Sequence, residues 1–404
     1  NAWIYNESPT QENLLFSFRD ETGKEVCQLP FLLNFKGWRC IWAKFQGDMN
    51  MPSKSNIQSV EIQFPQHTKK GVTYIDLLEF TPKVSWQNMS DAQYKVNRTD
   101  YSLIPDFIGY RNATPKVEKV ITAEDNQITT ITDRLTTWYL GSEQHSSERW
   151  IKMRTENEKT FLRNGVKAAQ KIKIQYNEDY TPQGEPLFPM GAPTIIDGQE
   201  AKKFRTINEN VLLPLALDYR KNKNDQSLKK ALYIYDWFND QGWADGSSMG
   251  TLCFEKLRSS GYFHSFFLLK EQLSPEQLKR ELQTMNWFTM FGACYQLPSY
   301  AGEVADNLRA LAIPKLIYAL SQNDKQEREV ALTAFKHYMD NALGIAPGFF
   351  GTFKADFSGY HHRGPYHSAY YPHALYAGAL IAYLLHDTPY ALSETTLHNL
   401  KQGL

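Results

Sequence analysis

The sequence predicts an α+β protein with several domains: an N-terminal β-sandwich, jelly-roll-like and incomplete, followed by an α/α toroid of antiparallel helix pairs. Short apolar runs with strand character fill residues 1–85, whereas apolar residues beyond about residue 126 recur every three or four positions. The chain has 404 residues, which is long for one domain. We place the sandwich at 1–85, a linker at 86–125 and the toroid at 126–404, incomplete at its C-terminal end.

The strands expected in the first 85 residues are short and separated by Gly, Asp, Asn and Pro, as in a β-sandwich. They are Ala2–Asn6, Leu14–Phe18, Phe31–Phe35, Trp38–Phe45, Ile57–Phe64 and Thr73–Phe80. The run Ile57–Phe64 shows the clearest alternation of apolar and polar residues. Because the chain opens directly on a strand, we expect the first strands of the sandwich to be missing from it.

The helices expected after residue 126 are amphipathic and joined by short turns. Ser274, Pro275 and Glu276 form a helix start with an N-cap, a proline and an acid in the first turn. Other apolar stripes fall in 126–138, 195–221, 227–243, 304–314 and 332–343. No sequence motif repeats at a fixed period, which favours a toroid over a repeat array.

Composition excludes several classes of partner. The formal net charge is +0, so an anionic ligand must meet local positive charge. No apolar run approaches the roughly 18 residues of a membrane span, and no phosphate-binding glycine loop is present. Aromatic residues make up 14%, which suits a carbohydrate groove or a large core. Cys27 and Cys40 fall in neighbouring expected strands and could form a disulfide or remain buried thiols.

The segment Asp356–Tyr376 reads DFSGYHHRGPYHSAYYPHALY and is the densest group of proton-transfer side chains in the chain. Its histidines and tyrosines are His361, His362, His367, His373, Tyr360, Tyr366, Tyr370, Tyr371 and Tyr376. Histidine titrates near neutral pH, and a perturbed tyrosine can act as an acid or base. Gly364 and Pro365 predict a loop that leads into a helix near His367. We expect a proton-transfer site on this loop.

Two other interpretations of the segment remain open. Tyrosines and histidines can line a helix end and form hydrogen bonds with backbone. A zinc site would require a spacing such as HExxH, and the four histidines lack it.

Three stretches of the second half carry a resemblance to a known family. They are ALTAFKHYMDNAL at Ala331–Leu343, ADFSGYHHRGPYHSAYYP at Ala355–Pro372 and LIAYLLHDTPY at Leu380–Tyr390. Together they resemble the catalytic helical domain of the chondroitin sulfate ABC lyases, in polysaccharide lyase family 8. NFKGWRCIWAKFQGDM at Asn34–Met49 is similar to the N-terminal β-sandwich of that family.

The resemblance implies cleavage of chondroitin- or dermatan-type chains by β-elimination. The C5 proton of the uronate is weakly acidic, so the reaction needs neutralisation of the uronate carboxylate, a base and an acid. The family's tyrosine falls on Tyr370, which we expect to be the base and the acid. Its histidine falls on His362 by the ABC-type spacing or on His361 by the hyaluronate- and AC-type spacing; we favour His362.

Further residues are expected to bind substrate. Within the segment these are Arg363 and Tyr366. Asn286 and Trp287 resemble the Asn-Trp pair that lines the family's cleft, although we favour Trp287 as a core residue of an amphipathic helix. His264, in GYFHSFF, stands near the place of a further family histidine.

The resemblance also implies an arginine and a glutamate that would lie beyond Leu404, so we expect a fragment without the C-terminal β domains. It implies a secreted or periplasmic monomer that acts on a polysaccharide, with no certain cofactor; a divalent cation, Ca or Mg, stays possible. A non-catalytic polyanion-binding protein on the same scaffold is the main alternative. Lyase action on hyaluronan or heparan sulfate is another. A glycoside hydrolase needs paired carboxylates, and the segment offers only Asp356.

Overall fold

The structure is a computed structural model that describes residues 1–67, 70–84, 91–94, 107–142, 147–176, 178, 181–188, 191–192, 201–248 and 258–404. Two units are distinguished by their internal contacts. Unit 1 comprises residues 1–106, 172–207 and 232–255, and unit 2 comprises residues 107–171, 208–231 and 256–404. The chain therefore leaves and re-enters each unit. The predicted domain boundaries at residues 85 and 125 stay predictions.

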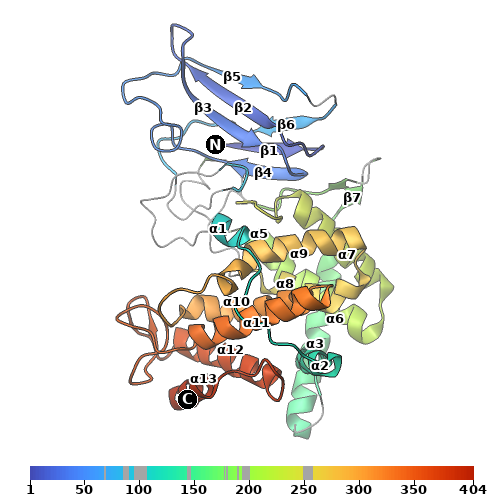
Figure 1. Ribbon diagram of the computed structural model, residues 1–404. Helices are drawn as coiled ribbons and strands as arrows, with labels where there is room; N and C mark the ends of the chain where they lie inside the picture. The colour runs from blue at the N-terminus through green and yellow to red at the C-terminus, as the bar shows by residue number, and fades with distance from the viewer. Residues whose placement is uncertain are drawn as a thin grey trace. The chain divides into compact units, whose positions relative to one another are not determined.

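Unit 1 contains two three-stranded antiparallel sheets, with strand orders β4-β1-β6 and β3-β2-β5 (Figure 1). Their strands are β1 (Ala2–Asn6), β2 (Asn13–Arg19), β3 (Glu25–Leu32), β4 (Gly37–Ile41), β5 (Ser59–Gln63) and β6 (Thr73–Asp76). Five predicted strands correspond to β1, β2, β4, β5 and β6, and the last three are shorter than predicted. The predicted strand Phe31–Phe35 is displaced, because β3 ends at Leu32. Pro30 is tolerated within β3 because β3 is an edge strand and one side of it needs no backbone donor.

The inward side chains of both sheets share one apolar core. Ala2 and Ile4 come from β1, and Leu14, Phe16 and Phe18 come from β2. Alternation along β2 places these three on one face, because successive side chains of a strand point in opposite directions. Cys27 and Cys40 are buried and both are free thiols, so the disulfide interpretation is not realised.

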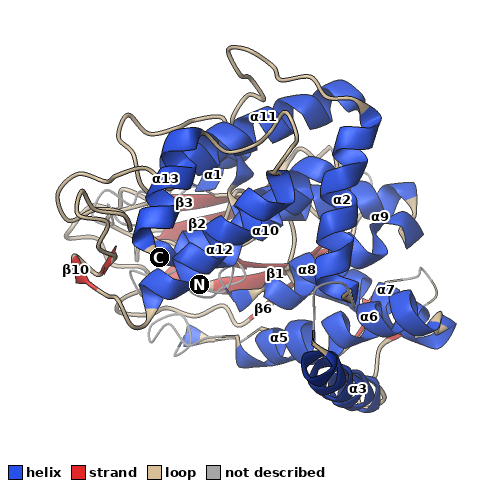
Figure 2. Cartoon of the chain, turned by 90° about the horizontal axis from the view of Figure 1, so that it is seen from below, coloured by secondary structure: helices blue, strands red, loops and turns tan. Residues whose placement is uncertain are grey.

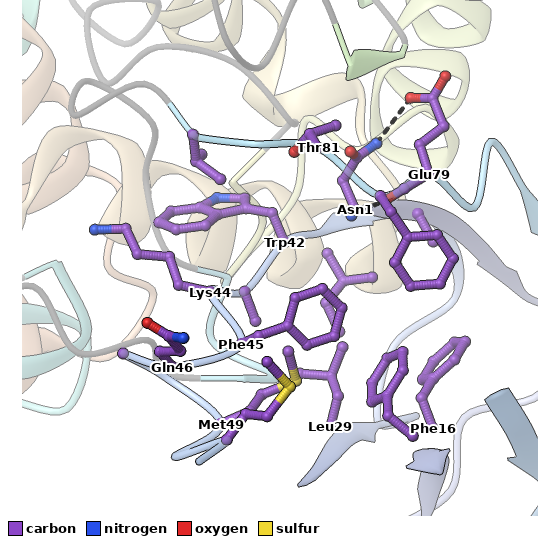
Figure 3. A pocket seen from close by; sticks show the side chains of 18 of the residues that line it. Asn1, Phe16, Leu29, Trp42, Lys44, Phe45, Gln46, Met49, Glu79 and Thr81 are labelled. Carbon is purple, nitrogen blue, oxygen red and sulfur yellow. Dashed lines mark hydrogen bonds between the residues drawn. The ribbon is translucent and has the colours of Figure 1, made fainter. Parts of the chain in front are cut away.

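A cavity of about 610 Å³ opens beside this core (Figure 3). Phe16, Leu29, Phe45 and Met49 give it an apolar lining. At its edge, the Asn1 side-chain nitrogen donates to Glu79 Oε2 over 3.2 Å. None of the residues predicted for catalysis lines this cavity.

Later segments complete unit 1. The short strands β7 (Gln175–Tyr176) and β8 (Pro182–Gln183) form a hairpin, and α5 (Lys202–Ile207) precedes the part of α7 (Asp225–Asp240) that belongs to this unit. The 240–248 segment packs directly against β4: a Cβ on Gly37 would lie 2.6 Å from the Asp240 carbonyl oxygen. Ser248 Oγ also donates to the Cys40 carbonyl over 3.1 Å.

Unit 2 consists mostly of helices (Figure 2). They are α1 (Phe107–Arg111), α2 (Asp125–Leu140), α3 (Glu148–Ala169), η1 (Asn208–Leu212), α6 (Leu213–Asn222), α8 (Ser260–Leu269), η3 (Lys270–Gln272), α9 (Pro275–Thr289), η4 (Phe291–Cys294), α10 (Ala305–Leu320), α11 (Lys325–Ala342), α12 (Tyr370–Leu385) and α13 (Glu394–Gly403). A two-stranded hairpin, β9 (Tyr360–His361) and β10 (Gly364–Pro365), precedes α12.

Local sequence signals account for these helices. Ser274 Oγ accepts from the Gln277 backbone nitrogen over 3.2 Å, which confirms the predicted N-cap of α9. α10 packs against α11 and α12, and the three lie side by side in Figure 1. Leu308, Leu311 and Leu316 of α10 are fully buried. The fold is thus helix-rich with small antiparallel sheets, as predicted in outline.

Two further expectations from the sequence concern the linker and the absence of a membrane span. Residues 86–90 and 95–106 of the predicted linker lie outside the described residues. No helix among the described residues has the length and apolar content needed to cross a bilayer.

Candidate active site

The hairpin β9–β10 builds the centre of the predicted site. Gly364 pairs with His361 and Pro365 pairs with Tyr360, so His362 and Arg363 form a two-residue turn. Both turn residues have positive φ, 49° for His362 and 64° for Arg363. Tight hairpins of this type require that backbone geometry, which is costly for residues other than glycine. The surrounding structure must therefore hold this turn in its unfavourable conformation.

The rings of His361 and Tyr370 are stacked. Their centroids lie 3.9 Å apart with an interplanar angle of 20°. Tyr370 is the first residue of α12. The next residue, Tyr371, anchors this helix start because its hydroxyl donates to the Phe357 carbonyl over 2.7 Å and its ring packs on Gly359. A side chain at Gly359 would collide with that ring, so the glycine allows the close approach.

Helix α10 contributes two charged residues to the same place. Asp306 Oδ2 lies 3.5 Å from His361 Nε2, and Asp306 Oδ1 lies 2.8 Å from an Arg309 guanidinium nitrogen. The Arg309 guanidinium carbon stands 5.5 Å from the Tyr370 ring centroid, in cation–π range. Arg309 keeps 43% of its side chain exposed and can reach a ligand.

The surroundings of His361 favour its neutral form. Burial lowers the pKa of His361, and His362 and Arg309 lower it further, whereas Asp306 raises it. The net direction is downward. No hydrogen-bond partner for His361 Nε2 exists among the described residues. The imidazole is therefore buried, its neutral form is favoured, and its Nε2 faces the Asp306 carboxylate.

The other predicted residues of the segment surround this pair. The His362 ring is exposed and meets His361 edge-on at 4.1 Å and Tyr370 edge-on at 5.4 Å between centroids. Tyr366 is 40% exposed and lies 5.1 Å from Tyr370. Arg363 is exposed at the turn. The structure thus brings together the five residues predicted within the segment.

Three predicted residues do not join this cluster. Trp287 is 1% exposed and packs against Phe107. It is therefore a core residue, which was one of the two interpretations of the sequence. Asn286 is half-buried beside it on α9. His264, on α8, is half-buried, and its Nδ1 lies 2.5 Å from the Tyr139 hydroxyl. No observation connects these three to the His361–Tyr370 pair, and their role in substrate binding stays a prediction.

Family models match nearly the whole chain. Residues 114–404 match the family described as lyase, catalytic, and residues 1–96 match the family described as lyase, N terminal. The chain belongs to this lyase family. The resemblance predicted from the sequence is confirmed.

Relatives of the lyase family align over the full chain. A chondroitin sulfate ABC exolyase of Bacteroides thetaiotaomicron is 25% identical over 435 residues, with 100% of this chain and 40% of the relative covered. A chondroitin sulfate ABC endolyase of Proteus vulgaris is 23% identical over 444 residues, covering 100% of this chain and 42% of the relative. The chain thus spans about two fifths of the length of these relatives.

A solved structure supports the fold of this family member. The structure of a Paenibacillus xanthan lyase matches with a TM-score of 0.52 and 13% identity, over 69% of this chain and 25% of the other. At this identity the match concerns the fold alone.

Sequence reasoning missed Asp306 and Arg309. They stand three residues apart at the start of an expected helix, so they share one face. Nothing in the sequence indicated that this helix packs on α12, whose first residue lies 61 positions beyond Arg309 in the chain. Within the described parts of the chain, no group of three or more His, Cys, Asp or Glu side chains is arranged to hold a metal ion.

Proposed function

We propose that this chain carries the proton-transfer part of a glycosaminoglycan lyase that cleaves chondroitin- or dermatan-type chains by β-elimination. The stacking of Tyr370 on a buried, neutral His361 carries the proposal. Membership of the lyase family and the names of the aligned chondroitin sulfate ABC lyases support it.

Tyr370 performs both proton transfers in this proposal. Its deprotonated phenol oxygen takes the proton from C5 of the uronate, and the electron pair forms the C4–C5 double bond. The C4–O bond breaks as this bond forms, and the phenol returns the proton to the departing oxygen. The products are an unsaturated uronate and a new hydroxyl end, with no net consumption of water. The Arg309 guanidinium beside the Tyr370 ring stabilises negative charge at this position.

His361 recognises the uronate carboxylate in this proposal. We assign the role to His361 because it is buried against Tyr370, whereas His362 is exposed and meets Tyr370 only edge-on. A neutral imidazole can donate one N–H to the carboxylate or accept a proton from a uronate of the opposite C5 configuration. His362 stays the alternative that the ABC-type spacing favours.

Exposed residues at the rim complete the substrate site. Arg363 offers a cation at the turn, and Tyr366 offers a ring face next to Tyr370. An arginine fork suits carboxylate and sulfate groups. We propose that both contact the polysaccharide.

The wider proposal follows the same family. The two sheets of unit 1 belong to a jelly-roll-like β-sandwich and the helices of unit 2 to an α/α toroid. The protein acts outside the cytoplasm, secreted or periplasmic, as a monomer on a polysaccharide. The shared core of the two sheets and the antiparallel strand pairing support the sandwich.

Ultraviolet absorbance tests the proposal. The chain is incubated separately with chondroitin sulfate, dermatan sulfate, hyaluronan and heparan sulfate, and absorbance from unsaturated uronate is followed. We expect a rise with the first two. Tyr370→Phe should lower kcat by about 10²–10⁴-fold with little change in binding, because the proton-transfer group is lost. Tyr383→Phe, on the exposed face of the same helix, is the matched control.

Each other outcome has a defined meaning. A rise only with hyaluronan or heparan sulfate would keep the lyase class and change the substrate. Retained binding without any rise would favour a non-catalytic polyanion-binding protein. Normal turnover by a folded Tyr370→Phe variant would exclude the role assigned to Tyr370.

A further inference from the structure

A groove of about 580 Å³ lies between α3 and α6 of unit 2. Three cationic side chains of α3, Lys159, Arg163 and Lys167, line one side of it. Asn222 and Asn224, at the end of α6 and just after it, line the other. In Figure 2, α3 lies on the opposite side of the view from β10, the second strand of the hairpin that carries His361. The groove is therefore separate from the candidate active site.

The three cations form a regular row. Spacings of four residues place them on one face of the helix, about 6 Å apart along its axis. All three are exposed, and none has an ion-pair partner among the described residues. Because the whole chain has a net charge of +0, such a local row is the kind of feature an anionic ligand needs.

The opposite wall of the groove is held in a fixed conformation. Asp218 Oδ1 accepts from the Asn222 side-chain nitrogen over 2.7 Å, and Asp218 Oδ2 accepts from Asn224 over 2.7 Å and from Ser227 Oγ over 2.5 Å. These three donors stabilise the carboxylate of Asp218, which is the one carboxylate among the described residues that line the groove. The amide oxygen of Asn222 stays open to a donor from a ligand.

Contacts between the two helices fix the width of the groove. An ion pair between Lys221 and Glu158 joins α6 to α3. A Cβ at Gly165 would lie 2.2 Å from Pro214 Cβ, so the glycine permits close approach of the helices. Leu162 and Val166 supply an apolar floor between the cations. A groove with a cationic edge, polar wall and apolar floor matches the charged groups, hydroxyls and C–H faces of a sugar chain.

We propose that this groove binds a second stretch of the sulfated uronic-acid polysaccharide, outside the candidate active site. The inference rests on the proposed function for the identity of the ligand. Arg163 binds a sulfate or carboxylate through its planar fork, and the flanking lysines follow neighbouring anions. Binding here holds a long chain on the protein between cleavage events and gives no advantage to short oligosaccharides.

The test measures binding of long chondroitin sulfate chains, in a Tyr370→Phe background so that the ligand stays intact. The groove variant carries Lys159→Gln, Arg163→Gln and Lys167→Gln. The control carries Lys24→Gln, Lys54→Gln and Lys401→Gln, three exposed lysines elsewhere, and loses the same net charge. We expect affinity of the groove variant to fall about 10- to 100-fold. We also expect the slope of log affinity against log salt to fall by about 2. The control should change little.

The outcomes separate the groove from the catalytic proposal. Equal affinities of the groove variant and the control would overturn the proposal that the groove binds polysaccharide. So would an unchanged salt slope. Arg163→Glu alone, checked for native circular dichroism, gives a second reading if the triple variant fails to fold, and it should also weaken binding. Lost binding in the groove variant, together with no absorbance rise from the chain that keeps Tyr370, would support polysaccharide binding in the groove and reject lyase activity. With Tyr370 restored, cleavage of a tetrasaccharide should be unaffected by the groove substitutions.

Discussion

The imidazole of His361 lies against three chemically different groups: the Tyr370 ring, the Asp306 carboxylate and the His362 ring. Burial has the largest effect on its pKa and lowers it. Its neighbour His362 is exposed on a turn. Two adjacent histidines therefore have different environments, and they should contribute differently to catalysis.

The pair can be compared by single substitution. His361→Asn should lower kcat/KM for chondroitin sulfate by about 10²-fold or more, because the carboxylate loses its buried partner next to Tyr370. His362→Asn should lower it less than tenfold. Initial rates by absorbance on chondroitin and dermatan sulfate measure both. A loss confined to dermatan sulfate would identify His361 as the base for the opposite C5 epimer. A larger loss of kcat/KM in His362→Asn than in His361→Asn would assign recognition of the uronate carboxylate to His362.

Because His264 is largely shielded from solvent, the free energy of unfolding should depend on pH. Burial lowers its pKa to about 4 from 6.5, so the unfolded chain binds more protons than the folded chain between these values. Stability should be complete above pH 6.5, fall as pH drops to about 4 and level off below. The loss is on the order of 3 kcal/mol.

Urea unfolding followed by tryptophan fluorescence at pH 7.5 and pH 4.5 measures this effect. His264→Asn keeps an acceptor for the Tyr139 hydroxyl and should lose much of the pH dependence. An equal acid-induced loss in both proteins would show that other groups are responsible.

At the scale of elements, the site depends on a hairpin turn and a helix start. The turn places His361 on β9, and the start of α12 places Tyr370 against it. The positive φ of both turn residues is unfavourable for histidine and arginine. The turn therefore retains strain while presenting two side chains that can contact a ligand.

Arg363 allows the backbone and the side chain to be tested separately. Arg363→Gly should relieve the strain at φ 64° and raise the free energy of unfolding by about 0.5–1 kcal/mol, while raising KM through loss of the cation. Arg363→Ala should raise KM equally without the gain in stability. Melting temperature and KM measured on both variants check this. A KM unchanged in both would remove Arg363 from substrate binding.

At the scale of the whole molecule, each unit is built from segments far apart in sequence. Unit 1 takes its two three-stranded sheets from the first 106 residues and adds residues 172–207 and 232–255. Phe204, Trp237 and Trp243 from these additions are almost completely buried. Ala92 donates to the Gly246 carbonyl over 2.7 Å across this separation in sequence. The sheets therefore depend on residues that are translated much later.

This interleaving predicts that residues 1–106 expressed alone are less stable than the same residues in the 404-residue chain. The fragment lacks the segment that packs against β4 around Gly37. Urea unfolding, followed by circular dichroism, should give a lower midpoint and a broader transition for the fragment. A sharp transition at the midpoint of the full chain would show that these strands fold independently.

Local patterns in the sequence were sufficient for several elements. Alternation predicted β5, and the Ser274 N-cap predicted the first residue of α9. These signals work because strand alternation and helix capping depend on neighbours within a few residues. The density of rings at 360–371 likewise indicated the candidate site. Its spacing did not distinguish His361 from His362, because the difference lies in burial on a turn.

The sequence by itself determined the family, the helix-rich fold with small sheets, and the segment that holds His361 and Tyr370. Only the tertiary structure decided that Asp306 and Arg309 join that segment, that Trp287 lies in the core and that α3 and α6 enclose a cationic groove. The physical reason is the range of the interactions. Periodicity, caps and turns act over a few residues, whereas burial and charge at a site depend on which distant helices pack together.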